Sequence, residues 1–144
     1  KSFSAQQTKE EFMSHFMGHL KKTLRKRRDF IFCGTFNTAH RPMDLSNWYA
    51  NQSVSGFLPS ERAWMEEMLG DLGFVDAFRE INKAERQFTW WPDYNRARTL
   101  NEGARLDYQI TTANVRKMVK NVSIYKDQMF SEHGPLTIDY DGDF

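Results

Sequence analysis

The stretch DFIFCGTFN, residues 29–37, decides the fold expected for this chain. Its first part, Phe30 to Cys33, is apolar and rich in aromatic and β-branched side chains, which is typical of a strand buried on both faces. We therefore predict the central strand of an α/β sheet. Gly34 ends the apolar run, and the polar residues Thr35 and Asn37 follow. Loops that leave central strands commonly hold ligands in α/β folds, so this strand end is the first candidate site.

Composition is that of a single-domain protein. The 144 residues suffice for one buried core, so we expect one domain over 1–144. The net charge of +1 indicates by itself neither a nucleic acid nor a membrane as partner. The single Cys33 lies in the apolar run and predicts a core thiol in a reducing compartment. No apolar segment reaches signal-peptide or membrane-spanning length, so the sequence predicts a cytoplasmic protein.

A helix with a strongly basic end is predicted before this strand. Apolar residues recur at three- and four-residue spacing between Ser4 and Arg28, and Thr8 with Glu11 predicts a capping box. Cations in a last turn favour the helix dipole, so the basic end is either a solvated terminus or a docking patch for a nucleic acid or a protein. Six basic residues in eight positions exceed what capping needs. They are Lys21, Lys22, Arg25, Lys26, Arg27 and Arg28.

The remaining pattern predicts an open two-layer α/β arrangement, with one mixed sheet and helices on one face. After a long loop over 39–57, the elements are a helix from 59 to 70 or 73, a helical turn at 75–81, paired strands at 87–91 and 105–110, a brief helix at 112–118, and strands at 119–125 and 135–140. Buried-type aromatics in the strands indicate that the other sheet face is covered by something outside this chain. The isolated fragment is therefore expected to self-associate through that face.

Polar residues at strand ends and in loops form the candidate site. If strand ends meet along one rim of the sheet, a His and a carboxylate would make a hydrogen-bonded pair suited to hydrolysis. Taken singly, an Asp on an alternating strand and a His before Gly-Pro are more often structural hydrogen bonders. His15 and His19 lack a third ligand, so no metal ligand is assigned. The candidates are Thr35, Asn37, Trp90, Asp107, Glu132 and His133.

Six motifs, read together, resemble the C-terminal half of the exonuclease III class of the endonuclease/exonuclease/phosphatase superfamily. They are CGTFNTAHRPMDL (33–45), FLPSERAWM (57–65), LGFVDAFRE (72–80), FTWW (88–91), RLDYQI (105–110) and SEHGPL (131–136). The resemblance covers nearly the whole chain and implies half of a DNase I-like four-layer α/β sandwich. The other half would cover the open sheet face and supply the metal-binding Glu. The start at Lys1, without Met, is expected for such a fragment.

The first motif departs from the pattern of active family members. Their strand ends in Gly-Asp-x-Asn, where the Asp and the Asn position the water and the scissile phosphate. Here Asn37 is kept, but Thr35 stands at the Asp position. A hydroxyl cannot hold a proton or orient a water as a carboxylate does, so hydrolysis should fall steeply.

The later motifs imply further roles and further changes. Trp90 matches the aromatic residue that lines the family's abasic-sugar pocket, and Asp107 matches the acid of the fifth motif. Glu132 replaces an Asp beside His133, and its longer side chain is expected to displace His133 or the metal. Ala104 replaces a Trp. The resemblance therefore implies a vestigial catalytic site.

A subgroup with this kind of change, the catabolite repression control proteins of pseudomonads and relatives, is similar through LRKRRDFIFCG (24–34), AHRPMDLSNW (39–48), WWPD (90–93) and LTIDYD (136–141). Its members are not nucleases, and they assist the RNA chaperone Hfq in repressing translation of A-rich messages. The resemblance implies a non-catalytic regulator without a cofactor, whose basic helix end contacts RNA phosphates or an acidic partner. The alternative is a Mg-dependent exodeoxyribonuclease III or apurinic-apyrimidinic endonuclease of DNA repair, which acts on DNA and tolerates Thr35 and Glu132. A third interpretation is a structural fragment without activity of its own.

Overall fold

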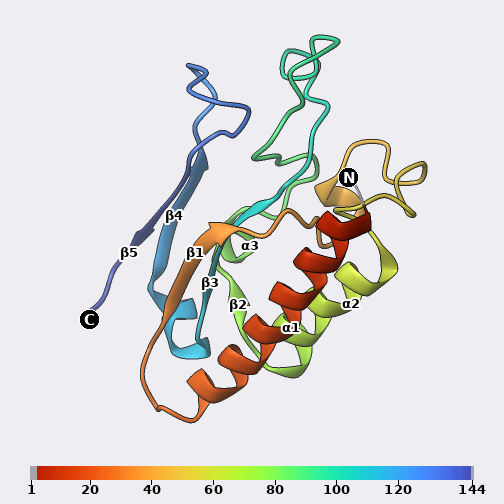
Figure 1. The fold of residues 1–144 in the computed structure, drawn as a ribbon. Coiled ribbons are helices and arrows are strands. Elements are labelled where there is room, and N and C mark those ends of the chain that lie inside the picture. The colour runs from red at the N-terminus through yellow and green to blue at the C-terminus, as the bar shows by residue number, and fades with distance from the viewer. Residues whose placement is uncertain (1–2, 144) are drawn as a thin grey trace.

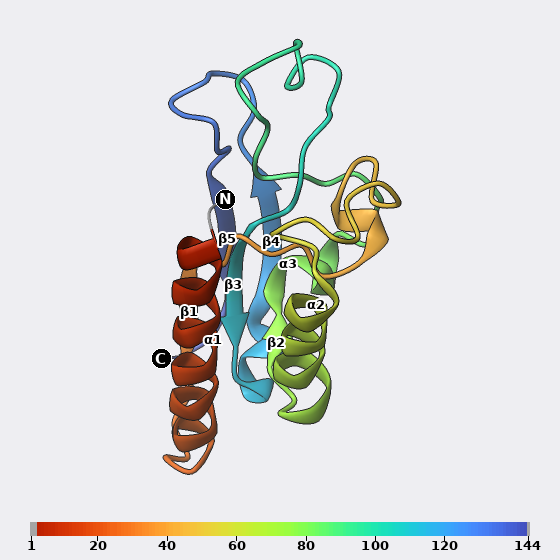
Figure 2. The same ribbon diagram turned by 45° about the vertical axis from the view of Figure 1, so that its right-hand side comes forward.

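Helices and strands form separate layers in the computed structural model, which describes residues 3–143 (Figures 1 and 2). The elements are α1 (Phe3–Leu24), β1 (Ile31–Thr35), η1 (Pro42–Asp44), α2 (Pro59–Glu66), η2 (Glu67–Asp71), β2 (Val75–Asp76), α3 (Ala77–Ile81), β3 (Asp107–Thr111), η3 (Ala113–Met118), β4 (Val119–Ile124) and β5 (Leu136–Tyr140). Figure 2 shows α1 and α2 side by side on one face of the strands. The predicted α/β class is confirmed.

Helix α1 follows the predicted apolar spacing, with Met13, Met17 and Leu20 buried on one face. It ends at Leu24, so the last four predicted residues form a turn and the link to β1. The predicted capping box at Thr8 is wrong, because the helix already begins at Phe3. The Thr8 hydroxyl instead donates to the carbonyl oxygen of Ser4, at 2.9 Å, inside the helix.

Strand β1 forms where it is predicted but has different neighbours. Among the described residues the three-stranded sheet has the order β1-β3-β2, so β3 is central and β1 is an edge strand. The prediction of a central β1 is therefore wrong. Side chains alternate along a strand, so Phe32 packs against the helices while Cys33 lies on the opposite, exposed face. The prediction of a core thiol is wrong for this reason.

The described strands pair only in the antiparallel sense, and β4 with β5 forms a separate two-stranded sheet. The predicted single mixed sheet is not found, because periodicity fixes which face of a strand is apolar but neither its direction nor its partner. The predicted pair of strands at 87–91 and 105–110 reduces to one isolated bridge between Trp90 and Ala104. Strand β3 pairs with β1 instead, with Ile31 opposite Thr111.

The main core lies between the helices and the three-stranded sheet. Tyr108 and Ile110 of β3 meet Met65 and Met68, and Phe74 closes the cluster. A second, smaller cluster lies under the loops, where Ile124 of β4 packs on buried aromatic and small side chains: Phe88, Trp91 and Ala97. Within residues 3–143 no helix is long and apolar enough to cross a membrane.

Candidate active site

The end of β1 and the start of β3 bring two candidate residues into contact. Antiparallel pairing sets Thr35 opposite Asp107, so both side chains point to the same face of the sheet. The Thr35 hydroxyl donates a hydrogen bond to Asp107 Oδ1, at 2.5 Å. A carboxylate at position 35 would meet Asp107 with like charge. The Thr35–Asp107 pair therefore carries at most one negative charge.

His133 extends this contact into a chain of three side chains. Its Nδ1 atom lies 2.8 Å from Asp107 Oδ2. An ionised carboxylate can only accept, so in this pairing Nδ1 carries the proton and Nε2 is the basic nitrogen. The Ser131 hydroxyl oxygen accepts from the His133 backbone N–H, at 3.0 Å, and fixes the loop locally. A His oriented by a carboxylate is an arrangement that general-base catalysis uses.

Backbone contacts hold the loop that carries Glu132 and His133. Trp90 forms isolated antiparallel bridges with both Ala104 and His133, and so joins two loops that are distant in sequence. Gly103 permits this approach, because a Cβ atom there would collide with the Trp90 carbonyl oxygen. The site is therefore built by close backbone packing, which a search for alternating apolar residues does not detect.

Asn37 is held by its backbone. Its φ of 51° is left-handed, and its carbonyl oxygen accepts from Lys9 Nζ at 2.7 Å. The same ammonium group forms an ion pair with Glu61, a side chain only 1% exposed. Glu61 Oε1 in turn accepts from the backbone N–H groups of Gly56 and Leu58, at 2.7 and 3.1 Å. Helix α1 thus fixes the polar turn after β1 through one buried ion pair.

One cleft gathers most of the candidate residues. A cavity of about 610 Å³ is lined by Asn37, Trp90, Glu132 and His133, among others. Trp90 Nε1 donates to Glu132 Oε2 at 3.3 Å, so the longer carboxylate turns to the indole while His133 contacts Asp107. Thr35 and Asp107 face a neighbouring cavity of about 280 Å³, which His133 also lines. His133 is therefore the wall shared by the two cavities.

The described residues do not fit a magnesium ion by themselves. No group of three or more His, Cys, Asp or Glu side chains within residues 3–143 could hold a metal ion. Mg²⁺ requires near-octahedral oxygen ligands, usually including a carboxylate. Asp107 already contacts Thr35 and His133, while Glu132 contacts Trp90. Any metal here would need donors beyond these side chains.

The basic helix end lies away from this cleft. Figure 1 shows the C-terminal end of α1 at the opposite end of the molecule from the loops over β4 and β5. Lys21 Nζ makes an exposed ion pair with Glu67, at 3.0 Å. The other five cations of the cluster are exposed: Lys22, Arg25, Lys26, Arg27 and Arg28. The structure therefore separates the predicted docking patch from the predicted catalytic residues.

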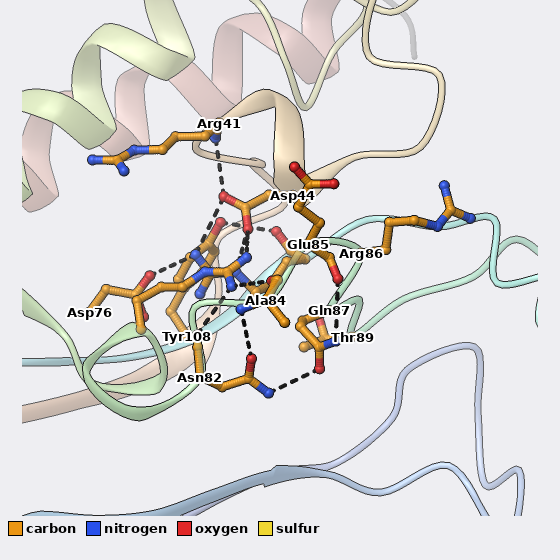
Figure 3. A network of polar contacts seen from close by, with 12 residues as sticks. Arg41, Asp44, Asp76, Asn82, Ala84, Glu85, Arg86, Gln87, Thr89 and Tyr108 are labelled. Carbon is orange, nitrogen blue, oxygen red and sulfur yellow. Dashed lines mark hydrogen bonds and ion pairs between the residues drawn. The ribbon is translucent and has the colours of Figure 1, made fainter.

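A buried charge network supports the loop before the cleft, and the sequence interpretation missed it (Figure 3). Asp44 accepts from Arg105 Nε at 2.8 Å, from Arg79 Nη2 at 2.5 Å and from the Arg41 backbone N–H at 3.1 Å. Arg105 Nη2 also lies 2.7 Å from Asp76 Oδ2, an ion pair without hydrogen-bond alignment. The network joins η1, α3 and β2 to the residues preceding β3.

The pKa shifts in this network follow from burial and from its ion pairs. Burial alone would raise the pKa of Asp44, but Arg105 and Arg79 outweigh it and hold that pKa below its ordinary value. Burial would lower the pKa of Arg105, yet Asp76, Tyr108 and Asp44 raise it. Burial also raises the pKa of Tyr108, whose hydroxyl donates to the carbonyl oxygens of Thr38 and Arg105. These shifts keep Asp44 and Arg105 charged and Tyr108 neutral at neutral pH.

Comparison with known proteins defines the class. Residues 2–133 match the model of the Endonuclease/Exonuclease/phosphatase family, and the chain belongs to that family. It is 34% identical to an exodeoxyribonuclease of Bacillus subtilis over 116 residues, which cover 80% of this chain and 46% of that protein. It is 31% identical to a DNA-(apurinic or apyrimidinic site) endonuclease of Dictyostelium discoideum over 131 residues, covering 90% and 36%. The chain thus spans less than half the length of these relatives.

Solved structures establish the fold. An AP endonuclease from Archaeoglobus fulgidus superposes with a TM-score of 0.87 at 24% identity, covering 98% of this chain and 56% of that one. A 3'-5' exonuclease from Neisseria meningitidis gives 0.87 at 20% identity, covering 94% and 54%. The DNase I-like fold predicted from the six motifs is confirmed. The relatives named here are nucleases, so the resemblance to exonuclease III-like proteins is supported at the level of the superfamily.

Proposed function

We propose that this chain belongs to a protein that contacts nucleic acid through an exonuclease III-like surface without hydrolysing it efficiently. In this proposal it acts as the catabolite repression control proteins do, assisting Hfq in translational repression of A-rich messages. The observation that carries the proposal is the Thr35 hydroxyl donating to Asp107. A threonine hydroxyl supplies no negative charge at the end of β1, where the family resemblance requires a carboxylate.

The loss of that charge bears on hydrolysis through proton transfer. A positioned acid or base contributes about 10²- to 10⁴-fold to such a reaction, and a threonine hydroxyl cannot accept the proton at neutral pH. Asp107 cannot take over the task freely, because its two oxygens already contact Thr35 and His133. The arrangement supports binding at this face more than it supports turnover.

The basic helix end supplies the charge for such binding. Its exposed cations lie outside the cleft, where a polyanion can reach them without entering either cavity. Each phosphate that they neutralise releases counterions, and it steepens the fall of log K with log(salt concentration) by about 0.7 for a single strand. The cluster Lys21 to Arg28 is therefore assigned to RNA phosphates or to an acidic partner.

A second candidate is a Mg-dependent exodeoxyribonuclease III or apurinic-apyrimidinic endonuclease acting on DNA in repair. Two observations favour it: His133 is oriented by Asp107, and the relatives at 31–34% identity are named as nucleases of these kinds. The comparisons support this candidate better than they support a role with Hfq. The geometry at position 35 is what argues against it.

The deciding assay measures cleavage of an abasic-site duplex by the full-length native protein with magnesium. We expect cleavage at background level, unchanged in the His133→Ala variant. Cleavage that Asn37→Ala or His133→Ala abolishes would overturn the non-catalytic proposal and establish the nuclease candidate. Thr35→Asp is the informative partner variant, since it restores the carboxylate that the resemblance expects.

A binding assay tests the regulatory role directly. Assembly of the full-length protein with Hfq on an A-rich RNA should weaken with salt, and charge reversal from Arg25 to Arg28 should weaken it further. Reversal of the exposed Lys117 and Lys120 gives a control with cations outside the cluster. If no assembly forms at low salt, or if both sets of reversals act alike, the assigned docking patch is wrong.

A further inference from the structure

The cavity beside Trp90 suits a neutral ligand better than a phosphate. Its lining includes the carboxylates of Glu102 and Glu132 and the imidazole of His133, and no Lys or Arg among the described residues lines it. A phosphate placed there would meet negative charge without a compensating cation. Its volume of about 610 Å³ lies within the usual range of small-molecule sites.

We propose that this cavity takes one unpaired nucleobase of a single-stranded nucleic acid, an inference that rests on the proposed nucleic-acid function. The strand's phosphates stay outside, while a single base turns inward. This assignment differs from an abasic-sugar pocket, in which a base would be excluded. The walls of the cavity carry two kinds of group that a base requires, namely aromatic faces and amides.

The aromatic groups are Trp90 and Tyr94. Trp90 forms part of the wall and is fixed by its backbone bridges to Ala104 and His133. Tyr94 lies at the same cavity and is 66% exposed, so its ring is available at the mouth. Base–aromatic stacking tolerates any base because each has a π face. The Trp90 ring, which donates to Glu132, and the exposed Tyr94 ring thus supply two aromatic surfaces for stacking.

The amides come from asparagines that line the cavity. Asn37, Asn47 and Asn95 have φ values of 51°, 50° and 52°, a left-handed conformation that Asn tolerates better than most residues. Backbone geometry therefore accounts for part of their identity. The hydrogen bonds from Lys9 to Asn37 and from Asn51 to Asn47 use backbone carbonyl oxygens, which leaves both side-chain amides available to donate and accept. Such an amide pairs with the adenine edge through N6 and N7.

The cavity is largely preformed, which reduces the ordering needed on binding. The Ser46 backbone N–H and its hydroxyl both donate to the Gly103 carbonyl oxygen at 3.0 Å, and this ties one wall to the other. Asn51 Nδ2 donates to the Asn47 carbonyl oxygen at 2.8 Å and holds the turn that presents the Asn47 side chain. A base would enter a site whose main walls are already hydrogen-bonded.

The test compares two short single strands on the full-length native protein. One carries 2-aminopurine at a central position, and the other is identical but abasic there. We expect quenching of 2-aminopurine on binding and at least about fivefold weaker binding of the abasic strand. The ratio of the two dissociation constants, abasic strand to 2-aminopurine strand, should fall in Tyr94→Ala. It should also fall in Asn47→Gly, because glycine keeps the left-handed backbone but removes the amide. Tyr49→Ala, on an exposed ring outside the cavity lining, should leave the ratio unchanged.

The possible failures are distinguishable. Equal or tighter binding of the abasic strand would overturn the base assignment while leaving the nucleic-acid function intact. Failure of both strands to bind would overturn both proposals. A ratio that Tyr49→Ala lowers as much as Tyr94→Ala does would place the base outside the cavity and so would also refute the inference.

Discussion

Removing the charge of Asp44 should cost the protein about 3 kcal/mol of stability. The Asp44 and Arg105 side chains are each 1% exposed, and Asp44 accepts from Arg105, Arg79 and a backbone N–H. The Asp44→Asn variant keeps the shape but leaves two guanidinium groups without their carboxylate. Breaking a buried pair costs about 3–5 kcal/mol. We expect the lower end because Asp76 still lies 2.7 Å from Arg105.

Urea unfolding of the full-length protein measures this loss as a lower midpoint at unchanged slope. The matched control is Glu67→Gln, which removes the exposed ion pair with Lys21, whose side chains are 51% and 38% exposed. Exposed pairs contribute no more than about 1 kcal/mol. An Asp44→Asn loss no larger than that of the control would refute the reasoning.

The same variant predicts a pH dependence. The pKa of Asp44 is lowered in the folded protein, because its ion pairs outweigh burial. A carboxyl group with a lowered folded pKa contributes stability above its unfolded pKa and loses it as pH falls through the folded pKa. The stability gap between native protein and Asp44→Asn should stay constant at neutral pH and narrow below about pH 4. A gap that narrows between pH 8 and pH 6 would contradict this assignment.

Four further outcomes are expected. Gly103→Ala should destabilise the folded protein by about 1–3 kcal/mol, because the new Cβ would meet a backbone oxygen. Its control is Gly18→Ala, in helix α1 with open space around it, which should stabilise the protein by about 0.5–1 kcal/mol. The thermal midpoint should fall in the first variant and rise in the second. Lys9→Met should cost about 3–5 kcal/mol, because it leaves the buried Glu61 carboxylate without its cation; an unchanged urea midpoint would contradict this. Burial raises the pKa of Tyr140 to about 12. The stability that Tyr140 contributes is therefore present below its ordinary pKa and is lost as pH rises through about 12. The step in phenolate absorbance near that pH should be absent from Tyr140→Phe. Residues 1–144 alone should self-associate through the open sheet face, and monomeric sedimentation at high concentration would disprove this.

The sequence predicted the local elements well, because each leaves a short-range signal. The apolar spacing of α1 and the apolar run of β1 arise from how these segments meet the core. The same signals could not place β1 at the sheet edge, since strand order depends on contacts between residues such as Thr35 and Asp107, which are 72 positions apart. Periodicity predicted the α/β class, and the order of the motifs predicted the DNase I-like fold within that class.

The site shows the same division. Asp107 and His133 could be named from motifs, and the structure brings them together. The sequence did not reveal the network around Asp44 and Arg105, because a buried ion pair leaves no periodic pattern. A single Asp or Arg is expected at the surface. One sequence feature hinted at the network: Asp44 follows Pro42 in a turn inside the first motif, in a segment that predicts no surface role for a charge. Burial of a charge becomes visible only when its partner, 61 residues away, is placed beside it.

The scaffold of the site does not depend on the charge at position 35. Asp107 is positioned by its backbone N–H, which donates to the buried Thr89 hydroxyl oxygen at 3.1 Å, and its carboxylate orients His133. Thr35 adds a hydrogen bond to this assembly and introduces no like charge beside Asp107. Catalytic sites are commonly less stable than the rest of a fold. A hydroxyl at position 35 avoids the repulsion that a carboxylate would have with Asp107, and this favours the folded state. The contacts that place Asp107 and His133 therefore require no carboxylate at position 35.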